Sequence, residues 1–279
     1  MNRRDGVGYV AVALVAAPVF VGALYSLAAA LGMAGAGANG FDLSRVIRVA
    51  SDANTWRSVA WTLTTASIAT VIATTAALFI AVRLQHSRLG QRLAVIPLAV
   101  PHIAASLAAL LLLGQSGLLS RVAFAVGLAG QPADFPAIVY DRSGVALIAS
   151  FAWKEFPFLA LTAFAVLATQ GDAFSEVART HGASARAIAR RITLPLLARG
   201  IAPAVIAAFA YLLGQYEMAV VLAPSDPLPL SVLTYERALD GDLQHRGEAH
   251  VLGLIALLFT GALVVMHERT RRAVSGADA

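Results

Sequence analysis

Six long apolar runs constrain this chain more than any other feature of its sequence. Each run holds about 18–26 residues, the length that an α-helix needs to cross a hydrocarbon core about 30 Å thick. The composition agrees, since only 13% of the residues are charged, against about 25% in an average soluble domain. We therefore predict an all-α integral membrane protein that forms a single transmembrane domain, residues 1–279. The predicted spans are residues 7–31, 58–82, 94–113, 144–169, 200–223 and 249–266.

The distribution of arginine gives the expected orientation, because cytoplasmic loops of membrane proteins carry an excess of basic residues. With the N-terminus in the cytoplasm, 13 arginines lie on that side of the membrane and seven on the other, while five acidic residues lie inside and nine outside. We therefore expect a multi-pass protein with both termini in the cytoplasm. The same loops account for the net charge of +5, so the basic side chains are expected to meet membrane lipid and not nucleic acid.

The chain lacks the residue patterns that hydrolytic chemistry needs. Its one lysine, Lys154, does not stand in the motif G-x-x-x-x-G-K-[ST], so the chain has no P-loop of its own for ATP. Cysteine is absent and the six histidines are scattered along the sequence, which argues against a metal site. A membrane enzyme therefore has no support, and we predict no catalytic residue, no metal and no cofactor in this chain.

A polar segment, residues 171–197, interrupts the apolar pattern between the fourth and fifth spans. Its spacing predicts two short amphipathic helices. Asp172 can cap the first helix, Gly182 breaks it, Ser184 can cap the second, and Pro195 is expected to stop the second. Taken alone, such a segment is typical of an interfacial loop whose arginines meet lipid phosphates.

The spacing within this segment is more specific than an interfacial loop requires. It resembles the signature E-A-A-x3-G-x9-I-x-L-P of the permease subunits of binding-protein-dependent ABC importers. One position departs from the signature, because Val177 stands where the family usually has alanine. The resemblance extends over about residues 94–250, most closely to the branch that serves polyamines, thiamine, iron(III), sulfate and phosphonates. The residues predicted to couple to an ATPase are Glu176, Ala178, Arg179, Gly182, Ala183, Ile192, Leu194 and Pro195.

The resemblance implies a type I importer fold, with a cytoplasmic coupling helix between spans four and five. In that family the coupling helix docks on a separate ATPase subunit, which would bind ATP and Mg. The implied partners are a second permease subunit, identical or homologous, two cytoplasmic ATPase subunits and an external substrate-binding protein. The implied location is the bacterial cytoplasmic (inner) membrane. A polyamine-like organic cation is the substrate expected first, with thiamine, iron(III), sulfate and phosphonate left open.

Charged residues inside the predicted spans need a reason, because each costs about 2.5–3.5 kcal/mol at the centre of a bilayer. Lys154 and Glu155 lie in the fourth span, and Glu217 lies just beyond the middle of the fifth. They either stabilise helix packing, as a lysine–glutamate pair would, or line the pathway of the transported solute. An ion-gradient-driven secondary transporter or channel with these three residues as a proton relay is the alternative function. The predicted pathway residues are Lys154, Glu155, Gln215, Tyr216, Glu217 and His102.

Overall fold

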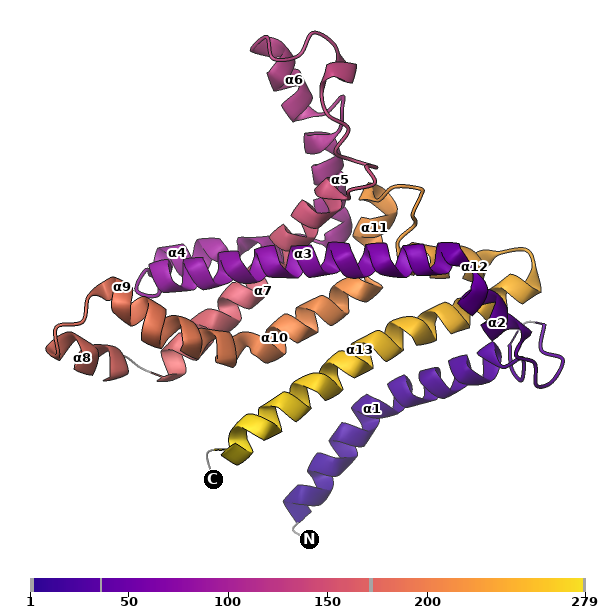
Figure 1. Cartoon of the computed structure of the whole chain (residues 1–279), viewed down its shortest axis with the longest axis horizontal. Helices are drawn as coiled ribbons and strands as arrows, with labels where there is room; N and C mark the ends of the chain where they lie inside the picture. Colours follow the sequence, from indigo (N-terminus) through magenta and orange to yellow (C-terminus); the bar gives the residue numbers. More distant parts are fainter. Residues whose placement is uncertain (1–2, 36, 171–172, 278–279) are drawn as a thin grey trace. The chain divides into compact units, whose positions relative to one another are not determined.

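The structure is a computed structural model that describes residues 3–35, 37–170 and 173–277. Within these ranges the chain forms helices and turns and no β-strand. Six helices of the described chain are long and apolar enough to cross a membrane (Figure 1). The predicted all-α fold with six membrane helices is thereby confirmed. The six segments are Val12–Ala30, Ala53–Leu84, His102–Ala125, Val145–Thr169, Ala185–Gly214 and Leu243–Arg269.

The chain divides into two compact units, of which the first comprises the described residues up to Val59 together with Leu230–Ala262. Helices from both ends of the sequence form this unit. Its elements are α1 (Arg3–Ala30), α2 (Ser44–Ser51), the start of α3 (Ala53–Leu84), α12 (Leu230–Leu239) and most of α13 (Leu243–Ala277).

A buried arginine joins three segments of the first unit. The Arg45 side chain is only 4% exposed, and its guanidinium donates hydrogen bonds to the carbonyls of Ala29 at 2.8 Å and Gly37 at 2.6 Å. Ala29 lies in the last turn of α1, where the carbonyls carry the negative end of the helix dipole. On the other side, a Cβ at Gly247 of α13 would lie 2.6 Å from atoms of the Arg45 side chain. Close packing of Arg45 therefore requires glycine at position 247.

A buried carboxylate forms a second polar centre in this unit. Glu248 of α13 is 5% exposed and accepts a hydrogen bond from Arg48 of α2 at 2.8 Å, while Arg237 of α12 lies 3.4 Å from its other oxygen. A buried carboxylate is tolerated only when it is paired. The two arginines thus link α2, α12 and α13 through a single acidic residue.

The second unit comprises Ala60–Pro229 and the described residues from Leu263 onward. Within it α7 packs against α10, and α11 packs against α5. Leu159 of α7 and Leu197 and Ile201 of α10 belong to the buried core. Besides the rest of α3 and α13, its elements are α4 (Arg88–Ala94), the 3-10 helix η1 (Ile96–Ala99), α5 (His102–Leu113), α6 (Leu118–Ala125), the 3-10 helix η2 (Pro132–Asp134), α7 (Val145–Gln170), α8 (Ala173–Thr180), α9 (Ala185–Ile188), the π-helix η3 (Ala189–Thr193), α10 (Leu194–Gly214) and α11 (Glu217–Leu222).

The structure departs from the predicted bounds at the third span. The prediction starts that span at residue 94, whereas α5 starts at His102, after the short helix η1. Pro97 and Pro101 account for the break, because proline has no backbone N–H and clashes with the preceding turn of a helix. The apolar run therefore continues through the sequence where the helix does not.

The fifth predicted span also divides in two. It was expected to run over residues 200–223, but α10 ends at Gly214 and α11 starts at Glu217. Gln215 between them has extended backbone angles, with φ −70° and ψ 110°. Glu217, expected just beyond the middle of one helix, is instead the first residue of a separate short helix.

Candidate functional site

The predicted coupling segment contains a glycine-dependent turn. Helix α8 ends in a Schellman motif, in which the N–H of Gly182 donates to the carbonyl of Arg179 at 2.9 Å and the N–H of Ala183 donates to that of Ala178 at 3.0 Å. Gly182 has φ +78°, and no atom lies within 4 Å of the position its Cβ would take. Glycine is therefore required here by backbone conformation and not by lack of space. The predicted helix break at Gly182 is confirmed.

The helix that follows starts as predicted and ends much later. The Oγ of Ser184 accepts a hydrogen bond from the N–H of Ala187 at 3.3 Å, so the predicted cap is confirmed. The prediction that Pro195 stops this helix is wrong, because α9 passes through the π-helix η3 directly into α10. Pro195 stands in the first turn of α10, directly after the wider turns of the π-helix η3. Proline is tolerated in the first turn of an α-helix, where its N–H is not needed for the α-helical hydrogen bonds.

The predicted coupling residues differ in exposure. Glu176, Val177 and Arg179 of α8 are exposed, with Val177 59% accessible. The other predicted coupling residues lie on both sides of the turn. Gly182 and Pro195 are exposed, whereas Ala178, Ala183, Ile192 and Leu194 are partly buried. The predicted cap at Asp172 lies outside the described residues.

Three of the predicted pathway residues meet around a side chain that the sequence did not single out. The hydroxyl of Tyr211 in α10 lies 3.3 Å from Nε2 of His102, the first residue of α5. Gln215 donates to the same hydroxyl at 3.2 Å and accepts the backbone N–H of Glu217 at 2.8 Å. Tyr211 therefore connects α5 to the break between α10 and α11. Its position one helical turn before Gln215 was the one sequence signal that could have found it.

This polar cluster opens onto the surface of the chain. Gln215 is buried, but Tyr211 is 47% exposed and Glu217 is exposed. Glu217 follows Gly214, the last residue of the fifth membrane-length segment, so its exposed carboxylate lies near one end of a span. Tyr216, between Gln215 and Glu217 in sequence, is partly buried.

Lys154 occupies a different place from the cluster. Its side chain, 4% exposed, donates to the carbonyls of Pro97 at 2.9 Å and Val100 at 2.6 Å. In a continuous helix the Pro97 carbonyl would accept from residue 101, which is a proline without an N–H. At the break the Pro97 carbonyl also accepts the N–H of Val100 at 3.3 Å. The contacts of the Lys154 ammonium with the two carbonyls favour the packing interpretation for this residue. Glu155, its neighbour in α7, is likewise buried, at 7% exposed.

A metal site has no counterpart among the described residues, where no three side chains of His, Asp or Glu come close enough together to hold an ion.

Comparison with known proteins places these features in a family. The family model described as "Binding-protein-dependent transport system inner membrane component" matches residues 75–268, a range that contains both the coupling segment and the polar cluster. The inner membrane ABC transporter permease protein YnjC of Escherichia coli (strain K12) is 29% identical over 211 residues, which are 74% of this chain and 39% of that protein. The molybdenum transport system permease protein ModB of Mycobacterium bovis is 29% identical over 179 residues, 62% of this chain and 61% of that protein.

The chain thus spans about two fifths to three fifths of the length of these curated relatives. A solved structure, the crystal structure of a bacterial alginate ABC transporter in complex with an alginate pentasaccharide-bound periplasmic protein, has a chain of similar fold. The TM-score is 0.73 at 16% identity, and the match covers 98% of this chain and 96% of the other. The family model covers well over half of the sequence, and the chain belongs to the family of binding-protein-dependent transport system inner membrane components.

Proposed function

We propose that this chain is the permease subunit of an ATP-driven ABC importer and that residues 173–197 couple it to a separate ATPase. The observation that carries the proposal is the turn at Gly182 together with the exposed helix α8 before it. Gly182 adopts the left-handed backbone conformation, and α8 exposes Glu176 and Val177. All three residues lie within the range that the family model matches. ATP and Mg would be bound by the partner ATPase, because the sequence has no P-loop.

The continuous helix after Gly182 gives the proposed coupling a physical route. Helices α9, η3 and α10 follow one another without a gap from Ala185 to Gly214. A rigid-body displacement of the docked α8–α9 turn would therefore move the far end of α10. That end carries Tyr211 and is followed by Gln215. ATP-driven motion at one end of the segment would thus change the polar cluster at the other.

The polar cluster supports a role in the translocation pathway. Tyr211 and Glu217 are exposed on the isolated chain, and His102 and Gln215 complete a set of hydrogen-bonding groups around the helix break. Glu155 and Tyr216 remain proposed pathway residues beside this set, and Lys154 is assigned to helix packing.

The assembly we propose contains a second permease, two cytoplasmic ATPases and an external binding protein, with both termini of this chain in the cytoplasm of a bacterium. The relatives' names concern molybdenum and alginate, so they give no support to the expected polyamine-like cation. The solute is best identified from the ligand that the cognate binding protein retains on purification, measured by mass spectrometry.

Coupling is tested on the assembled transporter in proteoliposomes. We expect Glu176→Lys to abolish ATP-dependent uptake and to reduce co-purification of the ATPase, while membrane insertion stays intact. Glu236→Lys, the same charge change at an exposed position of α12, is the matched control and should leave both unchanged. If tagged protein never retains an ATPase and uptake persists without ATP, the importer proposal is wrong, and the ion-gradient transporter takes its place.

A further inference from the structure

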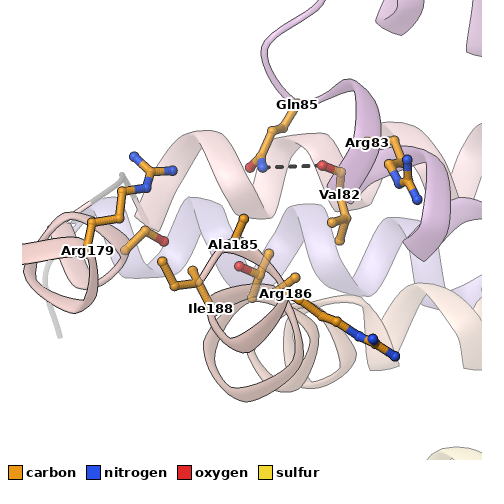
Figure 2. A pocket seen from close by; sticks show the side chains of 10 residues that line it. Val82, Arg83, Gln85, Arg179, Ala185, Arg186 and Ile188 are labelled. Atoms are coloured by element: carbon orange, nitrogen blue, oxygen red, sulfur yellow. Dashed lines mark hydrogen bonds between the residues drawn. The ribbon is translucent and has the colours of Figure 1, made fainter. Parts of the chain in front are cut away.

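A basic cleft lies beside the coupling segment, and neither Glu176 nor Val177 of α8 lines it. It has a volume of about 660 Å³, within the range of about 300–1,000 Å³ of ligand pockets. One side of it is formed by Val82 and Arg83 at the end of α3 and by Gln85 just after that helix (Figure 2). The other lining residues are Ser175 and Arg179 of α8, and Ala185, Arg186, Ile188, Ala189 and Thr193 of α9 and η3.

The charge of the cleft is of one sign. Among the residues that the structure describes, its lining contains Arg83, Arg179 and Arg186 and no acidic side chain. Among the described residues, none of these arginines forms a salt bridge; Arg83 instead stacks on the ring of Phe79, with its guanidinium carbon 5.2 Å from the ring centre. Cations gathered in a cleft without counter-charges raise the local concentration of anions, and arginine suits phosphate because its guanidinium forms paired hydrogen bonds.

The position of the cleft indicates which kind of anion it would bind. Its α3 wall is the end of a membrane-spanning helix, where the apolar sequence Phe79–Val82 gives way to Arg83. This is the depth at which hydrocarbon meets phospholipid headgroups. The floor is partly apolar, with Ile188 buried, and the helix that follows α3 exposes Leu89, a feature of interfacial helices.

We infer that this cleft binds the phosphate group of an anionic phospholipid, with its glycerol and acyl portions against the apolar wall. Arg83 and Arg186 lie toward one end of the cleft and Arg179 toward the other (Figure 2). The bound lipid would tether the segment that contains Gly182 to the membrane surface. The inference does not depend on the ATPase-coupling proposal, because lipid is present with or without a partner.

The test uses the full chain purified in a neutral detergent, with lipid retention measured by native mass spectrometry after titration with phosphatidylglycerol or phosphatidylcholine. We expect preferential retention of phosphatidylglycerol. The double variant Arg83→Gln and Arg186→Gln should weaken the binding of phosphatidylglycerol about ten- to thirty-fold, because each basic residue contributes about 1 kcal/mol at an anionic surface. The matched control changes Arg88 and Arg92 of α4 to Gln, since neither lines the cleft.

Three outcomes would overturn the inference. Equal loss in the cleft and control variants would mean diffuse attraction to the lipid surface. Displacement of phosphatidylglycerol by millimolar inorganic phosphate, with phosphate itself retained, would mean a site for free anions. If the cleft variant kept its lipid but lost a co-purifying ATPase, the arginines would serve a protein contact instead.

Discussion

Replacement of Gly182 by alanine isolates the backbone requirement of the proposed coupling turn. Because Gly182 has φ +78° and open space around its Cβ position, alanine adds strain and no clash. The left-handed conformation costs an L-residue about 1–2 kcal/mol, a factor of about 5–30 against the observed turn. We expect uptake per ATP hydrolysed to fall by up to that factor in proteoliposomes that contain the assembled transporter.

Two further substitutions at Gly182 should reduce coupling to different degrees. Asparagine tolerates the left-handed region better than alanine, so Gly182→Asn should lie between wild type and alanine. Proline fixes φ near −65° and removes the N–H that donates to Arg179, so Gly182→Pro should uncouple ATP hydrolysis from uptake completely.

The chain supplies a matched control for this series. Gly127, after α6, has φ +77° and nothing within 4 Å of its Cβ position. Its N–H donates to Phe124 and that of Leu128 donates to Ala123, the same Schellman pattern. Gly127→Ala thus imposes the same strain away from the coupling segment. If both alanine variants reduced uptake equally, or Gly182→Ala had no effect, the coupling argument for Gly182 would be refuted.

Three more substitutions test the packing and the polar cluster. Gly247→Ala should displace Arg45 from its two carbonyls and lower the free energy of unfolding by on the order of 3 kcal/mol, measured by thermal denaturation, whereas Gly253→Ala, in the same helix with open space, should not. Lys154→Met should destabilise the fold by about 1–3 kcal/mol, because the Val100 carbonyl loses its Lys154 donor; a stable variant that loses uptake would instead place Lys154 in the pathway. Tyr211→Phe removes the hydroxyl shared by His102 and Gln215 and should reduce uptake several-fold with little change in melting temperature, and unchanged uptake would remove Tyr211 from the pathway.

Features set by neighbours in the chain could be predicted from the sequence. The six membrane helices follow from uninterrupted apolar length, and the turn at Gly182 and the cap at Ser184 follow from residues within a few positions of each other. Local reasoning failed where two local rules competed. Pro195 was expected to end a helix, but the π-turns of η3 before it allow the helix to continue.

Tertiary structure alone decided which distant residues meet. Tyr211 and His102 are 109 positions apart, and Lys154 is 57 positions from Pro97, to whose carbonyl it donates a hydrogen bond. The basic cleft likewise needs the end of α3 beside α8 and α9. Periodicity shows that a side chain is polar in an apolar segment, but its partner depends on how helices pack. The sequence by itself therefore determined a membrane-spanning helical chain with a glycine-dependent turn at Gly182, and only the packing of its helices decided which distant polar residues contact one another.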